Sequence, residues 1–334
     1  MSLTTVLIAF AAMVVSTGLL LIVIALVWWL DRYDREPLHL VAAVFLWGAS
    51  VAPTVSIITV AALERMLAGS IPVASLELIG ISFFSPVVEE SIKAIGVVLI
   101  VLFTDKFDNP TDGLVYGTAV GLGFAVTENI VFALGAISEP GETAILILVG
   151  GRTLLSAGVH ALSSAAFGGL LGHAVLSRKR AARLGWLFAG LALAFGLHSA
   201  WNTALLYVGP FSPGGALRGW LAVLPLLYVV YVIILMAFLH SEHRILKREL
   251  AEEVDLRLAP AWVVDVIPYY SRRVRGNWWP SRTERTVIAR LLTRVAFRKH
   301  SIRHLPQDEA NIASLELVTL RQRVRKILGP PESH

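Results

Sequence analysis

The sequence contains no cysteine among its 334 residues, and charged residues make up only 16% of it. Without cysteine there are neither disulfides nor thiolate metal ligands. So small a charged fraction, together with 56% hydrophobic residues and a mean hydropathy of +0.69, excludes an ordinary soluble domain. Internal repeats and low-complexity stretches are also absent. What is present instead is a series of long apolar runs, which is typical of a membrane protein.

Seven apolar stretches are long enough to cross a hydrocarbon layer of roughly 30 Å as helices of about 20 residues. The predicted fold is therefore all-α, a polytopic transmembrane helix bundle. Two regions, 71–103 and 143–176, are longer than one helix needs, so each has room for a kink, a re-entrant piece or an additional short helix. The count is thus seven or eight, and the seven spans are about 5–30, 38–63, 78–103, 113–137, 145–176, 185–208 and 217–239.

Basic residues gather in the short loops that follow the first, fifth and seventh spans. Because such loops stay in the cytoplasm, we expect a bacterial-type cytoplasmic membrane protein with its amino terminus outside and its carboxyl terminus cytoplasmic. The first span lacks a basic leader and a cleavage pattern, so it is expected to be retained as a helix. The loop residues are Arg32, Arg35, Arg178, Lys179, Arg180, Arg183, Arg244, Lys247 and Arg248.

Charge divides the chain near residue 240. Residues 1–240 carry 11 basic and 13 acidic side chains, whereas 241–334 carry 18 and 11. We expect a transmembrane domain at 1–240 and a cytoplasmic basic tail at 241–334, with amphipathic helices at about 282–299 and 308–328. Such a tail predicts anionic lipid as a partner, worth about 1 kcal/mol per basic residue near the surface. No nucleic-acid partner is expected, because no known reader motif is present.

Several ionisable side chains fall inside the predicted spans. Each acid or base at a span centre opposes insertion by about 2.5–3.5 kcal/mol. We expect function to be the reason that the chain keeps them. They are Glu89, Glu90, Lys93, Glu128, Arg152, His160 and His198, of which Arg152 is expected to be structural, pairing with a membrane carboxylate or reaching the interface.

The first polar group begins a helix within the membrane layer. Ser85 followed by proline predicts an N-cap and a first turn. Lys93 stands at i+4 from Glu89 and at i+3 from Glu90, so both carboxylates can reach it. One lysine cannot neutralise two carboxylates, and a surplus buried carboxylate beside a like charge is the kind of group that acts as a general base. The alternative is an ion pair that only fixes helix packing.

Three later spans each add polar residues. Glu128 lies in a helix made otherwise of small and apolar residues, and His198 and Asn202 are i and i+4 on one helix face. His160 or His198 taken alone would more often be an interior packing residue. Together with Glu128 they indicate a shared site.

In this order, the residues resemble the PrsW intramembrane proteases. Glu89-Glu90-Ser91-Ile92-Lys93 is similar to their EExxK motif, Phe124-Ala-Val-Thr-Glu128 is similar to their FxxxE motif, and His160 and His198 fall where the family has histidines. His198-Ser-Ala-Trp-Asn202 also resembles a motif of the related CAAX prenyl endopeptidases of the Abi group. Glu128 departs from those enzymes, which have histidine there. The resemblance covers about residues 20–240 and leaves the basic tail outside it.

The resemblance implies an intramembrane protease, a hydrolase of membrane-anchored protein or peptide substrates. For a bacterial member this means regulated proteolysis, with site-1 cleavage of an anti-sigma factor as the example. By analogy Glu89 would activate water, and Glu90 with Lys93 would balance charge. His198 with Asn202 would stabilise the oxyanion, and His160 would join either role.

The involvement of a metal stays open at this point. Glu128, His160 and His198 would make a two-histidine, one-carboxylate zinc set with an open fourth position. The HExxH spacing that makes zinc a strong inference is absent. The alternatives are a zinc metalloprotease and a protease that depends on glutamate alone.

Two other classes of function compete with proteolysis. A proton-coupled transporter or channel would also bury carboxylates and histidines, but it would commonly show inverted repeats, and none is visible. A non-enzymatic scaffold that presents the tail leaves the membrane carboxylates unexplained. Convergence of the polar side chains at one place would favour hydrolysis, whereas their distribution along a pore would favour transport.

Overall fold

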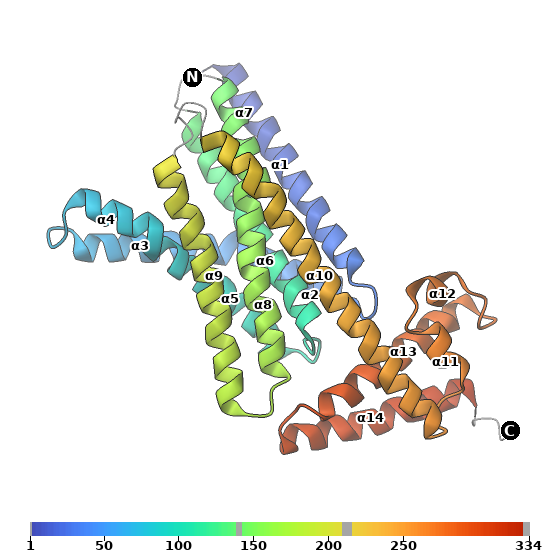
Figure 1. Ribbon diagram of the computed structural model, residues 1–334. Coiled ribbons are helices and arrows are strands. Elements are labelled where there is room, and N and C mark those ends of the chain that lie inside the picture. The colour runs from blue at the N-terminus through green and yellow to red at the C-terminus, as the bar shows by residue number, and fades with distance from the viewer. Residues whose placement is uncertain (1, 138–141, 209–215, 330–334) are drawn as a thin grey trace.

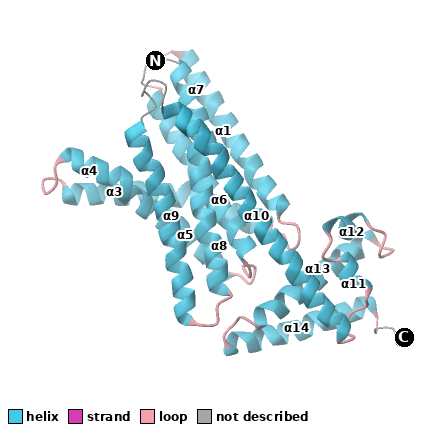
Figure 2. Ribbon diagram, in the orientation of Figure 1, coloured by secondary structure: helices cyan, strands magenta, loops and turns pink. Residues whose placement is uncertain are grey.

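The computed structural model describes residues 2–137, 142–208 and 216–329. All regular elements in these ranges are helices, which confirms the predicted all-α class (Figure 2). The first part of the chain contains α1 (Leu3–Leu30), α2 (Leu38–Leu46), α3 (Ala52–Leu67), α4 (Val73–Ile79), α5 (Ser85–Phe103), α6 (Pro110–Ala136), α7 (Glu142–Gly151), α8 (Ala157–Val175) and α9 (Arg180–Val208). The later part contains α10 (Ala216–Asp255), α11 (Trp262–Val266), α12 (Tyr270–Arg275), α13 (Arg282–Ile302) and α14 (Gln307–Leu328).

Six helical stretches of the described chain are long and apolar enough to cross a membrane, and they match six of the seven predicted spans. The seventh predicted span, about 78–103, corresponds to α5 and the turn before it, where Glu89, Glu90 and Lys93 interrupt the apolar run. The multi-pass bundle is thus confirmed, while the exact number of spans stays a prediction. The six stretches are Leu3–Leu30, Leu38–Leu67, Pro110–Ala136, Ile145–Val175, Arg180–Leu206 and Pro225–Asp255.

Three widened π-helical turns interrupt these helices. They are η1 (Trp47–Val51), η2 (Gly80–Phe84) and η3 (Arg152–Ser156). Helices α3 and α4 project from the bundle as a hairpin, and η1 and η2 lie where its two arms continue into α2 and α5 (Figure 1). The short helix α4 and the turn η3 are the irregularities expected in the two overlong apolar regions.

Helix α6 packs against α8 with almost no space between their backbones. A Cβ atom built on Gly113, Gly117 or Gly121 of α6 would lie 1.9, 2.2 or 2.3 Å from the carbonyl oxygen of the facing residue on α8. Small residues permit such close approach of helices within a membrane. This contact brings the polar side chains of α6 and α8 into one interior.

Gly117→Ala should lower stability, because the added methyl group would meet the backbone of Ser164 rather than a side chain that can move aside. Overpacking of this kind costs about 1–3 kcal/mol. Gly135→Ala on the same helix is the matched control, since no atom lies within 4 Å of its Cβ position. There the helix propensity of alanine should add up to about 1 kcal/mol. Unfolding midpoints of the detergent-purified variants measure both, and equal stabilities would contradict the close-contact explanation.

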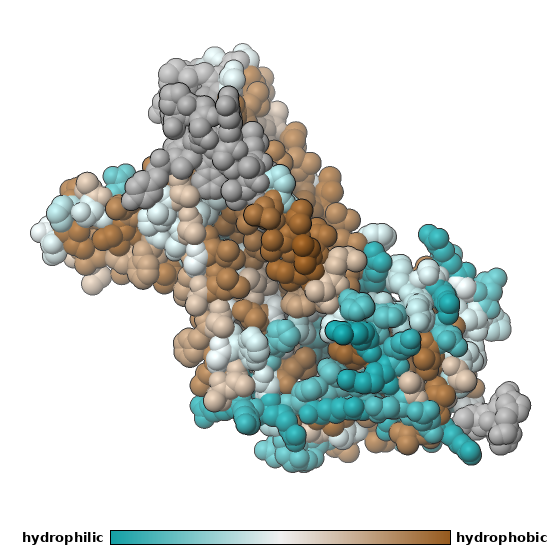
Figure 3. All heavy atoms as spheres, viewed as in Figure 1, coloured by the Kyte–Doolittle hydropathy of each residue, from teal (hydrophilic) through white to brown (hydrophobic). Residues whose placement is uncertain are grey.

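The basic tail is a helical unit with its own apolar core. Helices α13 and α14 occupy the two segments predicted to be amphipathic. Their apolar faces, including Leu292, Val295, Leu317 and Val324, pack with Leu246 and Leu250 of α10. Hydrophobic surface covers the bundle and hydrophilic surface gathers over the tail (Figure 3). Part of this apolar surface therefore binds other parts of the protein, while Ile312 and Leu315 of α14 remain exposed.

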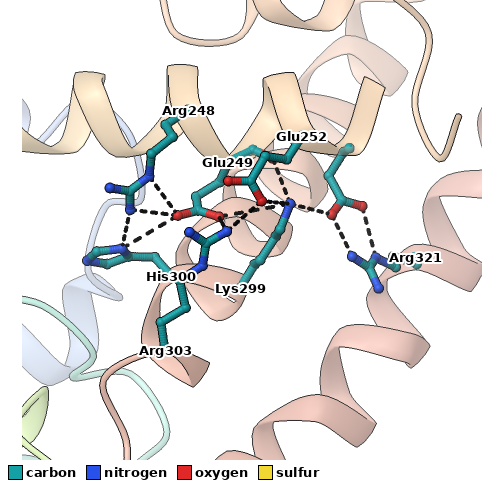
Figure 4. Close-up of polar contacts among 8 residues, drawn as sticks. Arg248, Glu249, Glu252, Lys299, His300, Arg303 and Arg321 are labelled. Carbon is teal, nitrogen blue, oxygen red and sulfur yellow. Dashed lines mark hydrogen bonds and ion pairs between the residues drawn. The ribbon is translucent and has the colours of Figure 1, made fainter. Parts of the chain in front are cut away.

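Helix α10 runs from Ala216 to Asp255 without a break, so no loop separates the two parts of the chain at residue 240. Buried Glu249 and Glu253 on α10 hold the tail helices in place (Figure 4). Glu249 lies 3.0 Å from Arg303, the residue that follows α13, and Glu253 lies 3.1 Å from Lys299 of α13 and 2.5 Å from Arg321 of α14. These ion pairs fix the tail to the last span.

Candidate active site

Both carboxylate oxygens of Glu90 on α5 have polar partners. Its Oε1 accepts a hydrogen bond of 2.8 Å from Lys93 Nζ and lies 2.9 Å from His198 Nδ1. Its Oε2 accepts a hydrogen bond of 3.1 Å from Ser164 Oγ. Lys93 has no exposed surface, and its Nζ also lies 3.8 Å from the centre of the Phe124 ring. Both oxygens of Glu90 are thus committed to neighbours on α5, α8 and α9.

The carboxylate of Glu89 points toward Ser85 and His198. Its Oε1 accepts a hydrogen bond from Ser85 Oγ. Its Oε2 is buried without a hydrogen-bond partner among the described residues, 3.8 Å from His198 Nε2. Ser85 therefore does not act as the predicted N-cap, because η2 runs directly into α5 and leaves no free helix end there. The serine hydroxyl orients Glu89 instead.

The two histidines have defined hydrogen-bonding roles. Lys93 Nζ, which can only donate, lies 2.9 Å from His160 Nδ1, so His160 Nε2 carries the hydrogen and donates to Glu128 Oε2 at 2.6 Å. His198 Nδ1 faces the Glu90 carboxylate and carries its hydrogen, which leaves the Nε2 lone pair free toward Glu89. The rings of His160 and His198 lie 4.7 Å apart, edge to face.

Glu128 of α6 forms the outer part of the cluster. Besides His160, its Oε2 contacts Arg152 Nη2 of η3 at 2.7 Å, which is the membrane ion pair expected for that arginine. The Arg152 guanidinium also lies 3.6 Å from the centre of the Phe132 ring. About a quarter of the Glu128 side chain is exposed, whereas Glu90 is almost fully enclosed.

Asn202 lies one turn after His198 on α9 but outside this network. Its Nδ2 donates to the carbonyl oxygen of Ile81 in η2 at 3.1 Å. The amide thus ties α9 to the turn that precedes α5. Because Nδ2 carries a second hydrogen, the amide can keep this contact and also donate to another acceptor.

The structure brings together predicted residues from α5, α6, α8 and α9, and it groups the metal-ligating atoms differently from the sequence. Ligand atoms of Glu89, His160 and His198, all buried, lie within 4.8 Å of one another. The predicted trio had Glu128 in place of Glu89. Ser164 was not singled out from the sequence and Ser85 only as an N-cap, although each stands four residues from a predicted residue, Ser85 before Glu89 and Ser164 after His160.

Comparison with known proteins bears on the same region. The sequence profile of a family described as "PrsW family intramembrane metalloprotease" matches residues 36–239. Protease PrsW of Geobacillus kaustophilus is 36% identical over 177 residues, which is 53% of this chain and 71% of the relative. Protease PrsW of Bacillus subtilis is 34% identical over 176 residues, 52% of this chain and 73% of the relative.

A third relative, protease PrsW of Clostridioides difficile, is 27% identical over 177 residues, 53% of this chain and 71% of its own length. No solved structure gives a significant match. The family match spans more than half of the chain and contains every residue of the buried cluster. The chain belongs to the PrsW family of intramembrane proteases.

Proposed function

We propose that the buried cluster hydrolyses a peptide bond within or beside the membrane, with Glu89 as the general base. The observation that carries this proposal is the contrast between the two adjacent carboxylates. Glu89 Oε2 is buried and has no hydrogen-bond partner among the described residues, whereas both oxygens of Glu90 are bonded. A general base needs an oxygen free to take a proton from water. Glu90 instead balances the charge of Lys93 and orients His198.

The remaining residues are assigned by their contacts. His198 faces Glu89 through a nitrogen that carries no hydrogen, so it accepts a proton or binds a metal there. His160 links Lys93 to Glu128 and positions the second histidine ring through edge-to-face contact. Asn202 would help to stabilise the oxyanion with its second amide hydrogen, since the first is donated to Ile81 O.

A zinc ion fits the donor set that the structure provides. With zinc bound, Glu89 Oε2 would be a ligand rather than the general base, His198 Nε2 would donate its lone pair, and His160 would exchange one of its hydrogen bonds for the ion. Two imidazoles and one carboxylate with an open position are typical of catalytic zinc sites. Bound zinc would supply Lewis-acid polarisation and lower the pKa of a water. Glu90 would act behind His198, as the carboxylate that fixes a ligating histidine.

Elemental analysis of the detergent-purified protein should give about one zinc per chain. His198→Ala should remove the metal, because it deletes one ligand and leaves Glu90 without its partner. His173→Ala is the control, since His173 lies on α8 beside Trp186 and outside the cluster. Metal-free wild-type protein that still cleaves substrate in strong chelator would contradict the zinc assignment and favour hydrolysis by glutamate alone.

The proposed substrate is a membrane-anchored regulatory protein, with an anti-sigma factor as the example that the family resemblance implies. A transporter is not favoured, because the family and the named relatives are proteases. Labelling of new amino termini in membranes from cells that express the active chain or Glu89→Gln would identify the substrate. Cleavage sites present with both proteins would belong to other proteases.

We also propose that the amino terminus lies outside and the basic tail in the cytoplasm. The predicted cytoplasmic loops contact the tail directly. Tyr33, after α1, donates to Pro268 O at 3.0 Å, and Arg183, in the first turn of α9, pairs with Glu309 of α14 at 2.6 Å. One side of the membrane must therefore hold both loops and the tail. On the cytoplasmic side, the tail would meet anionic lipid headgroups.

A further inference from the structure

Arginines converge on a cavity where the tail meets the first loop. The cavity has a volume of about 250 Å³ and lies between the segment after α1 and helices α12 and α13. Its lining contains a single carboxylate, that of Asp34, against a set of guanidinium groups. These belong to Arg32, Arg35, Arg273, Arg282, Arg285 and Arg290.

Several of these guanidinium groups are held in place by neutral acceptors rather than by acids. Arg273 donates to Tyr33 O at 3.0 Å and to Thr293 Oγ1 at 3.2 Å. Arg35 donates to the carbonyl oxygens of Asp31 and Trp29, each at 3.0 Å. Neutral acceptors fix the direction of a guanidinium group without cancelling its charge. The cavity is thus arranged in advance for an anion.

Other arginine donors at the same cavity have no hydrogen-bond acceptor among the described residues. The Nε atom of Arg285 is buried without an acceptor among the described residues. The guanidinium groups of Arg282 and Arg290, both exposed, form no hydrogen bond or ion pair within that part of the chain. Burial lowers the pKa of Arg273, the Asp34 carboxylate opposes this shift, and the neighbouring Arg290 adds a smaller lowering. A buried donor without a partner in the protein is typically satisfied by a bound anion or water.

The position of the cavity favours a lipid as the source of that anion. Helix α1 ends at Leu30, directly after Trp28 and Trp29, and paired tryptophans mark the boundary between hydrocarbon and headgroups. Arg32 and Arg35 follow within five residues, and the Arg32 guanidinium lies 5.5 Å from the centre of the Tyr270 ring. Guanidinium groups bind phosphate through paired, parallel hydrogen bonds. The cavity therefore lies at the level of lipid phosphates.

We propose that this cavity is a binding site for the phosphate of an anionic phospholipid headgroup, which joins the tail to the loop after α1. The proposal rests on the proposed attraction of the tail to anionic lipid and adds a defined site to it. It depends on the guanidinium groups that line the cavity and not on the apolar residues of the tail.

The test is titration of full-length, detergent-purified protein with short-chain phosphatidylglycerol, followed by calorimetry. The double variant Arg282→Gln/Arg290→Gln should bind at least tenfold more weakly than wild type. Both side chains are exposed, so folding should be unaffected, and thermal unfolding checks this. The matched control is Arg323→Gln/Arg325→Gln, which removes the same charge from exposed positions of α14 and should bind as wild type does.

Each outcome decides a different point. Equal weakening in the two double variants would overturn the site and leave only diffuse attraction of the tail to lipid. No binding by the wild type would overturn both that attraction and the site. Short-chain phosphatidylcholine should bind poorly, because its headgroup has no net charge. Inorganic phosphate that binds as tightly as phosphatidylglycerol and competes with it would overturn the lipid assignment and make the cavity a site for soluble phosphate.

Discussion

Glu89→Gln should give a folded, membrane-inserted protein whose cleavage rate is lower by about 10²–10⁴-fold, the usual contribution of a general base. The amide keeps the shape of the side chain and its contact with Ser85 but cannot take a proton from water. Because Glu89 Oε2 has no hydrogen-bond partner among the described residues, its loss removes no bond from the fold. Release of new amino termini from a co-expressed single-pass substrate measures the rate.

Two companion variants make this result specific. Glu77→Gln, on the exposed side of α4, removes the same charge outside the cluster and should leave cleavage unchanged. Glu90→Gln should mainly lower stability, because Glu90 is the ion-pair partner of buried Lys93. If Glu89→Gln cleaves normally while Glu90→Gln loses rate but not stability, then Glu90 is the general base and Glu89 is not.

Lys93→Met should destabilise the bundle by about 3–5 kcal/mol, the cost of removing one partner of a buried ion pair. Lys93 is fully buried, and its ammonium contacts Glu90 at 2.8 Å and His160 at 2.9 Å. Methionine has a similar volume, so the loss would come from the charge left on Glu90. Unfolding of the purified variants by denaturing detergent measures the difference.

The double variant Lys93→Met/Glu90→Gln separates charge from packing. If the loss in Lys93→Met is caused by an uncompensated carboxylate, removal of that charge should restore much of the stability. Additive losses from the two single variants would instead indicate that Lys93 acts through packing against Phe124.

The sequence predicts contacts along one helix well and contacts between helices poorly. The spacing of Glu90 and Lys93 within α5 predicts their ion pair, and the structure contains it. The same reasoning allows Glu89 to reach Lys93, yet Glu89 points toward Ser85 and His198. Adjacent residues on a helix are rotated by about 100°. Only the packing of α8 and α9 decides which of the two carboxylates meets the lysine.

In the basic tail, too, the sequence predicts the helices better than the contacts between them. Periodicity locates α13 and α14 and identifies their apolar faces, including Leu292 and Leu317. Periodicity does not say what covers those faces: Leu292 and Leu317 pack in the tail core with α10, whereas Ile312 and Leu315 are exposed. Likewise the change of charge near residue 240 is real, but α10 continues through it, because local charge does not end a helix.

The π-helical turns η2 and η3 determine how the site responds to the loss of one residue from the chain. Each π-helical turn accommodates one residue more than the α-helix around it, and η2 directly precedes Ser85 while η3 begins with Arg152. Deletion of one residue within such a turn would leave a continuous α-helix whose two ends keep nearly the same relative rotation, whereas deletion of one residue from the regular helix before Glu89 would rotate that side chain by about 100°. A chain that loses one residue from η2 would thus keep Ser85 and Glu89 facing the same neighbours. The π-helical turns are therefore the positions at which relatives can differ in length by one residue and still retain this arrangement.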